Sequence, residues 1–480
     1  MEEEKIIMDF ITEEINTIPN ILKKKLTTNN KKITPREELE KIKHNINKFL
    51  EGKTSNRFNV LSGLRGVGKT ILLYQTYEYL LKEKNINPEQ ILYISCEELN
   101  NINKCDIKKL IDIYLKQKYN TNLRLLNKKI FLLIDEAQYD KNWSISGKII
   151  YDKTDEIFMI FTGSSALSME YNADSARRML KKVITPLNYS EHIKLKYGLK
   201  LNITQPLIKL IFEGKIDEAK KAEEKINTIL TNHIPYTNND WEEYLKYGGF
   251  PILFNENDYT DLNSKLIDMV NKVINTDLIR FKNFNFENQA NANRILRFLA
   301  LQKAGNLSQN KLSNYLKTSS LNVKNILDTL EKTKLIFHCE PYGTSTKRIN
   351  KSWKYYFATS SLRYNLSISL GNSTHNTEEY EGTIIENLVA STLFNFLQKE
   401  NKYISLYYDS NDTNSDFILQ EDFKSPIPIE VGRGKKDKRQ IKTSMNKYNA
   451  EYGIIVSNKE SEIKKDGDVI HITPKTFSFL

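Results

Sequence analysis

Cysteine and histidine are scarce in this chain of 480 residues. The three cysteines, Cys96, Cys105 and Cys339, are too few and too widely spaced for a disulfide framework or a Cys-x-x-Cys metal site. The six histidines are equally dispersed. His338 stands next to Cys339 in a predicted strand, where neighbouring side chains point to opposite faces of the sheet. We therefore expect no structural metal.

Long apolar runs are also absent, because no segment approaches the roughly 20 residues that a membrane helix needs. Runs such as KIFLLI and IFMIF have the length of buried strands. The amino-terminal segment MEEEKIIMDF is acidic where a secretory signal would be basic. These features predict a cytoplasmic protein without a membrane partner.

The chain carries a net charge of +11, with 39% hydrophobic and 27% charged residues. This composition is typical of a soluble globular protein, and the length allows about three domains of ordinary size. The positive charge has two explanations: a polyanionic partner, or a composition rich in Lys, Asn and Ile that reflects the base composition of the genome. Only the placement of the charges distinguishes them.

Local patterns divide the chain into five predicted segments. Residues 1–55 contain two helical stretches, and residues 56–194 alternate strands with helices. The strand candidates FNVLS, ILYIS, KIFLLID, EIFMIFTGSS and KKVITPL are continuous apolar runs, which favour a parallel sheet covered on both faces. Residues 195–290 are helical except at YLKYGGFPILF, and residues 291–370 contain three helices and two strands. A last α/β segment covers residues 380–480.

The segment GLRGVGKT matches the phosphate-binding pattern G-x-x-x-x-G-K-[ST] and lies between a predicted strand and a predicted helix, as that pattern requires. Glycines allow backbone N–H groups to approach phosphate oxygens, and the helix amino terminus adds a positive dipole. Lys69 is expected to bridge the β- and γ-phosphates, and the Thr70 hydroxyl to bind Mg²⁺. The predicted nucleotide contacts are Gly63, Leu64, Arg65, Gly66, Val67, Gly68, Lys69, Thr70 and Ile71. The loop therefore predicts a nucleoside triphosphate ligand.

Two acidic residues follow the apolar strand of KIFLLIDEAQ. Asp135 is predicted to hold the Mg²⁺ shell, and Glu136 to polarise the attacking water as a general base. Small-molecule kinases share the loop without this adjacent glutamate, so the pair favours hydrolysis. The alternative is an ordinary solvated strand end.

Further polar groups are candidates for the same site. The strand EIFMIFTGSS ends in a polar tip, and we expect Ser164 to sense the γ-phosphate if this strand lies between the other two. Arg177 and Arg178 in ADSARRML are candidates to neutralise charge during phosphoryl transfer, with Arg178 preferred. The alternatives are a Gly-Ser turn and a solvated helix face.

The segments ITPREELEKI, GLRGVGKT, LLIDEAQ, FTGSSA, ITPLNYSEHI and YLKYGGFP, in this order, resemble a family of archaeal and bacterial AAA+-type ATPases. That family belongs to the P-loop ATPases with an additional catalytic glutamate. The resemblance implies ATP rather than GTP as the nucleotide. It also implies a helical lid domain, a winged helix and a restriction-endonuclease-like carboxyl-terminal domain. Arg36 and Glu37 resemble the amino-terminal box beside the adenine.

Residues 291–370 fit a winged helix from their own pattern. In such a module the third helix offers its exposed residues to the major groove, and the wing contacts phosphates. Asn322, Lys324 and Asn325 would then face the bases. Lys347, Arg348 and Lys351 would lie in the wing, which is predicted to be a loop. The alternative is a winged helix that only packs against neighbouring domains.

In the last segment, Glu386, Asp416 and Glu430 resemble in spacing the acids of a PD-(D/E)-x-K nuclease. That chemistry needs a lysine two residues after the second acid, where this chain has Gly432. Lys435 or Lys436 could reach in from the following loop, but the spacing does not require it. We therefore interpret the three acids as a vestige without cleavage activity.

The basic run GRGKKDKRQIKTSMNKY favours nucleic acid as the polyanionic partner, since it lies on this nuclease-like segment. The alternative is a solvated face that binds nothing. The cations of this run are Arg433, Lys435, Lys436, Lys438, Arg439, Lys442 and Lys447.

Together these patterns predict an ATPase that acts as a switch or motor on DNA. One alternative is a regulatory nucleotide switch that senses a protein partner and hydrolyses slowly. A less favoured alternative is an ATP-dependent nuclease. A second copy of the chain is a further candidate partner.

Overall fold

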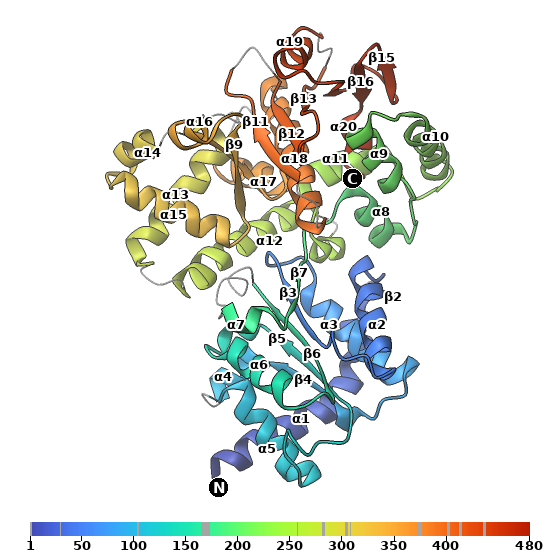
Figure 1. Cartoon of the computed structure of the whole chain (residues 1–480), viewed down its shortest axis with the longest axis vertical. Helices are drawn as coiled ribbons and strands as arrows, with labels where there is room; N and C mark the ends of the chain where they lie inside the picture. The colour runs from blue at the N-terminus through green and yellow to red at the C-terminus, as the bar shows by residue number, and fades with distance from the viewer. Residues whose placement is uncertain are drawn as a thin grey trace. The chain divides into compact units, whose positions relative to one another are not determined.

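The computed structural model of the chain describes residues 2–480 except 29, 103–104, 165–172, 257, 281–283, 303–305, 308, 372–376, 401–403, 412–414 and 435–437. Lys435 and Lys436, which were predicted to contact nucleic acid, therefore lie outside the described residues. The chain forms two compact units, Met1–Ile184 and Thr185–Leu480. Figure 1 shows a sheet flanked by helices in each unit.

A five-stranded parallel sheet forms the centre of the first unit, in the order β4-β5-β6-β3-β7. Every predicted apolar run of residues 56–194 forms one of these strands, and four of the five strands are almost entirely buried, which confirms the predicted mixed α/β fold. Because β6 pairs with both β3 and β5, the strand with the polar tip lies between the other two. The strands are β3 (Phe58–Ser62), β4 (Ile91–Ser95), β5 (Ile130–Asp135), β6 (Ile157–Gly163) and β7 (Leu180–Val183).

Helices cover this sheet and supply the rest of the core. The amino-terminal helix α1 packs against β4 and α5 through Ile7, Phe10 and Ile11, which are buried. The first 55 residues thus contribute to the same core as the sheet. The helices are α1 (Glu2–Lys25), α2 (Glu37–Leu50), α3 (Lys69–Glu78), α4 (Cys96–Ile102), α5 (Ile107–Tyr119), α6 (Trp143–Lys153) and α7 (Ala173–Ala176), and the short strands β1 (Thr27–Thr28) and β2 (Lys31–Lys32) form a hairpin.

The second unit is built on a nine-stranded sheet in the order β15-β16-β14-β13-β12-β11-β9-β10-β8. Its strands are β8 (Asn306–Leu307), β9 (Ile336–Pro341), β10 (Trp353–Phe357), β11 (Ile404–Tyr408), β12 (Phe417–Glu421), β13 (Ile427–Val431), β14 (Gly453–Val456), β15 (Lys464–Asp466) and β16 (Val469–Ile472). Strand β11 joins β9 in parallel, with Tyr407 opposite Glu340 and Tyr408 opposite Pro341. The segments predicted as residues 291–370 and 380–480 therefore share one sheet.

One core unites the helices of the second unit with this sheet. Helix α18 lies near its centre with twelve buried residues. Helices α9 and α10 pack into the same core through residues such as Leu207 and Ile226, so most of segment 195–290 belongs to this unit. The helices are α8 (Tyr189–Tyr197), α9 (Thr204–Glu213), α10 (Asp217–Thr231), α11 (Asn239–Tyr247), α12 (Tyr259–Lys272), α13 (Phe286–Leu301), α14 (Gln309–Leu316), α15 (Ser320–Lys332), α16 (Ser345–Asn350), α17 (Ser360–Ser369), α18 (Glu378–Lys399), α19 (Arg439–Tyr448) and α20 (Pro474–Phe477).

The segment from α13 to β10 follows the predicted pattern with one correction. Ser319 caps α15 by accepting a hydrogen bond from the Asn322 amide at 3.1 Å. The connection between β9 and β10, predicted to be a loop, contains the helix α16. Thr344 caps that helix, since its side chain accepts from the Lys347 amide at 3.4 Å.

The Gly248–Gly249 turn connects three parts of the second unit. Gly249 has φ +99°, and a Cβ there would lie 2.8 Å from Thr359 Cγ2, so the position requires glycine. Its carbonyl accepts from the Leu187 amide at 2.9 Å, while the Gly248 carbonyl accepts from the Ser361 hydroxyl at 2.6 Å. The turn thus fixes the chain before α8 and the start of α17.

The three cysteines are buried free thiols. Burial raises the pKa of each thiol, to about 11 for Cys105. Within the described part of the chain, no helix combines the length and the apolarity that crossing a bilayer requires.

His192 on α8 generates a prediction about pH. Its ring is buried among Tyr189, Tyr244 and Phe254, with centroids 4.9–6.1 Å away. Burial, and then the charge of Lys196, lower its pKa to about 3. In the unfolded chain this histidine binds a proton near pH 6.5, whereas in the folded chain it stays neutral. The free energy of unfolding therefore falls as the pH drops below 6.5.

We expect the wild-type chain to lose about 2 kcal/mol more than His192→Phe between pH 7.5 and pH 5, measured by urea unfolding. The change His44→Gln on the exposed face of α2 serves as the control and should follow the wild type. Equal pH dependence of the wild type and His192→Phe would contradict the lowered pKa of His192 in the folded chain.

Candidate functional site

The predicted phosphate loop lies at the carboxyl edge of the first unit's sheet, between β3 and α3. Gly66 and Gly68 have φ of +86° and +97°, which residues with a Cβ rarely adopt. A Cβ on Gly63 would lie 2.3 Å from the Ile184 carbonyl oxygen. The glycines are therefore required by two backbone turns and by the close approach of the chain that follows β7.

Lys69 begins α3 and folds its side chain back over the loop. Its exposed fraction is 6%, and Nζ donates to the Gly63 and Leu64 carbonyls at 2.9 and 3.1 Å. Burial of an ammonium group is costly unless several oxygens surround it. Phosphate oxygens would meet that requirement, so the lysine fits a nucleotide.

The Asp135 carboxylate at the end of β5 is buried and accepts hydrogen bonds from side chains of three elements. Thr70 Oγ1 of α3 donates to Oδ2 at 2.8 Å, and Tyr93 of β4 donates to the same oxygen at 3.2 Å. The Thr162 hydroxyl of β6 donates to Oδ1. The sequence predicted Asp135 and Thr70. Tyr93 was missed, and its position near the end of the neighbouring strand is the only signal that could have indicated it.

Burial, and then the neighbouring charge of Glu136, raise the pKa of Asp135, while Thr162, Thr70 and Lys69 act in the opposite direction. The aspartate and the Thr70 hydroxyl are hard oxygen donors of the kind that Mg²⁺ prefers. This donor set fits a magnesium site.

Glu136 directly follows β5 in a strained conformation. Its φ is +50°, a left-handed value that costs a residue with a Cβ about 1 kcal/mol. Its amide donates to Asp135 Oδ1 at 3.2 Å, and its carboxylate accepts from the Gln138 side chain. The strained turn thus keeps the Glu136 backbone against Asp135 while Gln138 orients its carboxylate. Gln138, the last residue of the DEAQ motif, is an orienting group that the sequence analysis did not identify.

Ser164 follows β6 and is 5% exposed, and its hydroxyl has no hydrogen-bond partner among the described residues. The register of β6 between β3 and β5 places it at the same sheet edge as the loop and Asp135. An unsatisfied buried hydroxyl is unfavourable in the absence of a ligand. This environment is consistent with the predicted γ-phosphate contact.

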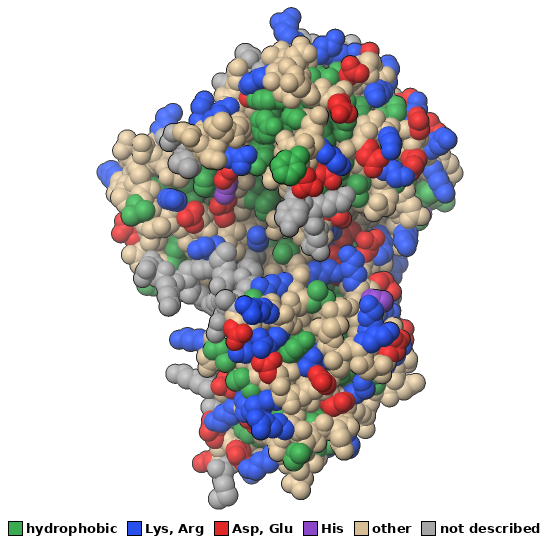
Figure 2. All heavy atoms as spheres, in the orientation of Figure 1, with side chains coloured by type: hydrophobic (Ala, Val, Ile, Leu, Met, Phe, Trp, Pro, Cys, Tyr) green, Lys and Arg blue, Asp and Glu red, His purple; other side chains and the backbone are tan. Residues whose placement is uncertain are grey.

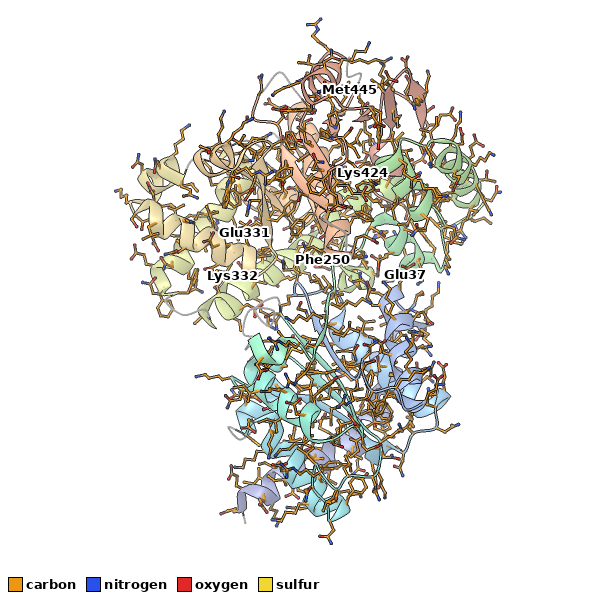
Figure 3. The ribbon with its side chains drawn as sticks, viewed as in Figure 1. Glu37, Phe250, Glu331, Lys332, Lys424 and Met445 are labelled. Atoms are coloured by element: carbon orange, nitrogen blue, oxygen red, sulfur yellow. The ribbon has the colours of Figure 1, made fainter. Side chains whose placement is uncertain are left out.

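Arg36 lies directly against the phosphate loop. It is 4% exposed, and Nη1 donates to the Val67 carbonyl at 2.8 Å. Its ion-pair partner is the buried Glu38, with Nε and Oε2 3.2 Å apart. Glu37, which the sequence paired with it, is exposed on α2 (Figure 3). The predicted residue is therefore at the site, but its acidic partner is one position further along.

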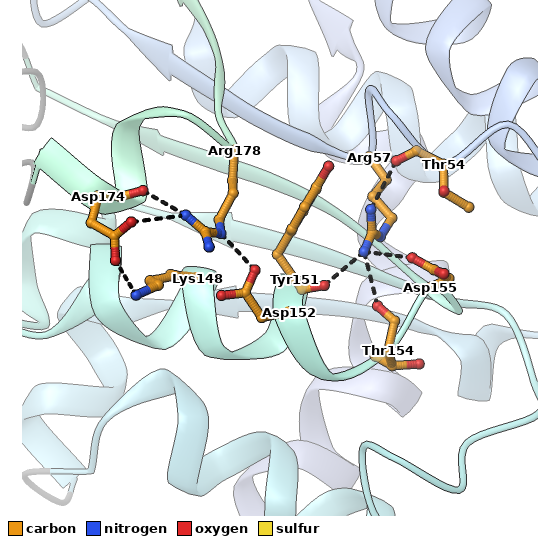
Figure 4. A network of polar contacts seen from close by, with 9 residues as sticks. All are labelled: Thr54, Arg57, Lys148, Tyr151, Asp152, Thr154, Asp155, Asp174 and Arg178. Atoms are coloured by element: carbon orange, nitrogen blue, oxygen red, sulfur yellow. Dashed lines mark hydrogen bonds and ion pairs between the residues drawn. The ribbon is translucent and has the colours of Figure 1, made fainter.

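The structure does not bring Arg178 to the loop of its own chain. Its guanidinium forms ion pairs with Asp152 and Asp174, at 2.5 and 3.2 Å, in the network of Figure 4. Asp152 lies near the carboxyl end of α6, which leads to the amino end of β6. This is the edge of the sheet opposite the loop. Arg177 is exposed.

The three acids of the nuclease-like segment lie around β12 and β13 of the second unit. Glu386 Oε1 accepts from Tyr356 at 2.8 Å and lies 3.8 Å from Lys354 Nζ. Burial, and then the charge of Asp416, raise the pKa of Glu386 to about 7. Glu430 is completely buried. Among the described residues, no group of three or more His, Cys, Asp or Glu side chains is arranged to hold a metal ion.

The predicted nucleic-acid contacts have different environments. Asn322 donates its amide to Asn288 and Thr318, whereas Lys324 is exposed. Arg433 forms ion pairs with Glu378 and Glu381. Lys347 and Arg348 lie on α16, and Arg439 is exposed on α19.

Comparisons with known proteins agree with the geometry of the first unit. A family model described as an AAA domain matches residues 55–193. Two models described as domains of unknown function, DUF8612 and DUF4143, match residues 238–375 and 381–476. Residues 55–193 thus form an AAA-type P-loop ATPase domain.

The uncharacterized protein MJ1637 of Methanocaldococcus jannaschii is 32% identical over 472 residues, which are 98% of this chain and 94% of that protein. The chain belongs to the same family as MJ1637. MJ1544 of the same organism is 26% identical over 411 residues, covering 83% of this chain and 80% of the relative.

Solved structures are more distant. The Walker-type ATPase PabY2304 of Pyrococcus abyssi covers 70% of this chain and 96% of its own, with 16% identity and a TM-score of 0.38. The ORC1 protein of Aeropyrum pernix, solved in complex with DNA, covers 70% and 93%, with 12% identity and a TM-score of 0.31. Likenesses at this level carry no functional argument.

The contacts of Arg36 generate a second prediction. Replacing Arg36 or Glu38 by Ala leaves the other buried charge without its partner and removes support from the loop. We expect each change to weaken nucleotide binding by about tenfold or more, because a charged hydrogen bond contributes about 1.5–3 kcal/mol. Binding of a fluorescent ATP analogue measures the effect. Glu37→Ala is the matched control and should bind as the wild type does; a loss equal to that of Glu38→Ala would contradict this arrangement.

Proposed function

We propose that the first unit binds and hydrolyses ATP with Mg²⁺. The observation that carries this proposal is the Thr70 hydroxyl held 2.8 Å from the buried Asp135 carboxylate, beside Lys69 and Glu136. The AAA-domain match over the same residues supports it.

The residues of the chain suggest how hydrolysis would proceed. Lys69 would exchange its loop carbonyls for β- and γ-phosphate oxygens, and Thr70 with Asp135 would hold Mg²⁺. A bound Mg²⁺ supplies neutralisation of phosphate charge. Glu136 would accept a proton from the attacking water, while Ser164 would donate to the γ-phosphate or to that water. Arg36 would keep the loop in its binding conformation through the Val67 carbonyl.

We also propose that the second unit binds DNA, with residues 286–357 acting as a winged helix. The order of elements supports this assignment: α13, β8, α14, α15, β9, α16 and β10, with β10 paired to both β9 and β8. Lys324 is exposed on α15 and suits a contact in the groove. The amide of Asn322 already donates to two side chains, so we assign it to shaping the α13–α15 packing.

The carboxyl-terminal segment is proposed to bind rather than to cut. Its order resembles the nuclease core: α18, the antiparallel strands β11, β12 and β13, then α19, and β14 parallel to β13. Gly432 offers no ammonium group beside Glu430, and its amide donates to the Val456 carbonyl at 3.0 Å. The nearby Arg433 is ion-paired with two glutamates.

The test of hydrolysis is Glu136→Gln. This change removes the proposed base but keeps its size, so the steady-state ATPase rate should fall by about a hundredfold or more, while ATP affinity stays near that of the wild type. Lys69→Ala, in contrast, should bind ATP more weakly than the wild type. The exposed Glu51→Gln is the matched control. An undiminished rate in Glu136→Gln would remove this glutamate from the mechanism, and negligible turnover by the wild type would favour a regulatory nucleotide switch.

The test of coupling is the ATPase rate with and without duplex DNA. We expect DNA to raise the rate of the wild type and to leave that of Glu136→Gln unchanged. A wild-type rate that does not respond to DNA would disprove coupling without affecting the assignment of ATP hydrolysis.

A further inference from the structure

Two short basic helices that are far apart in the sequence lie next to one another in the second unit. Helix α16 follows β9, and β9 pairs with β11, whose end leads to Asp409 beside α19. The Tyr342 amide donates to the Tyr408 carbonyl at 2.9 Å, and the Tyr342 ring packs edge-on against Tyr448 with centroids 4.9 Å apart. These contacts join the two helices into one surface.

Helix α16, with the sequence STKRIN, contains no acid. Arg348 lies over the Tyr407 ring, 4.4 Å from its centroid, and donates to the Gly343 carbonyl at 3.1 Å. That contact anchors the helix, and Lys347 lies close enough to Lys447 and Lys351 to feel their charges. Burial, and then the charge of Lys447, lower the pKa of Lys347.

Helix α19, with the sequence RQIKTSMNKY, also contains no acid. Its apolar side packs Ile441 and Met445 (labelled in Figure 3) against Ile455 and Val469. The opposite side is exposed and carries Arg439, Lys442 and Lys447. Arg439 and Lys447 are eight positions apart, which is ~12 Å along the helix axis. Duplex DNA carries about seven phosphates over that length.

Within the described part of this region, the acid next to α19 is Asp409, and it is hidden from solvent. The Asp409 side chain is completely buried, accepts from the Tyr448 hydroxyl at 2.5 Å and lies 3.4 Å from Lys447 Nζ. It holds the carboxyl end of α19 without presenting negative charge outward. Figure 2 shows Lys and Arg side chains on the part of the second unit where Figure 1 places α16 and α19.

Like charges gathered in this way repel one another, so a fold that keeps them together favours a ligand of opposite charge. We propose that α16 and α19 form a single binding surface for the phosphodiester backbone of duplex DNA. This inference rests on the proposed DNA association and combines the cations around α16 with those of α19 in one contact surface. Cations from two helices, with no exposed acid in either helix, suit a backbone contact that does not depend on base sequence.

The experiment measures the affinity of the full-length chain for a labelled duplex by fluorescence anisotropy over a series of salt concentrations. The double variant Lys347→Glu with Lys447→Glu should bind about tenfold or more weakly. The negative slope of log affinity against log salt should become shallower by about 2. The milder variant Lys347→Gln with Lys447→Gln should shift in the same direction, which separates lost contacts from misfolding.

The matched control is Lys221→Glu with Lys225→Glu on the exposed face of α10, which changes the net charge equally. It should keep the wild-type slope. If the α16–α19 variant keeps the wild-type affinity and slope while the wild type binds DNA, α16 and α19 are not the binding surface, and the proposed DNA association is unaffected. If the wild type binds no duplex, both the surface and the proposed DNA association are wrong, and the ATPase proposal is judged by Glu136→Gln.

Discussion

The buried carboxylate of Asp135 is the group on which the first unit's site depends. A charge at 5% exposure is tolerated only with several donors, and here hydroxyl groups from β4, β6 and α3 supply them. Those elements meet because β6 lies between β3 and β5. The strand order is therefore part of the site, since a different order would separate Thr162 and the loop from the aspartate.

The second unit uses its charges differently. Burial and the neighbouring charge of Asp416 raise the pKa of Glu386, and the nearby cation comes from Lys354 of β10 rather than from the strand of Glu430. The acids are thus engaged inside the fold. The cations of α19 are exposed, and the buried Asp409 forms an ion pair with one of them, Lys447. Of the three nuclease-like acids Glu430 is completely buried, whereas the cations Lys442 and Lys447 of α19 are exposed.

Much of the ATPase unit was predictable because its signals are local. The five strands are continuous apolar runs, and the loop glycines with Lys69 stand within eight residues. The resemblance assigned Arg36 and Glu37 to the box beside the adenine, but spacing did not reveal that the adjacent Glu38 is the buried partner of Arg36. Tyr93 was missed for a similar reason, because its contact with Asp135 depends on the pairing of β4 with β5. Arg178 was expected near the phosphates, and its ion pairs hold it at the opposite sheet edge.

The sequence by itself determined the phosphate loop, the acid pair after β5 and the alternation of strands and helices, because each is set by neighbouring residues and their backbone preferences. Only the tertiary structure decided that β9 and β11 join two predicted domains into one sheet. That pairing brings Lys347 and Lys447, a hundred positions apart, to the same surface. Hydrogen bonds between strands distant in sequence leave no local pattern, so the shared surface exists only once the chain has folded.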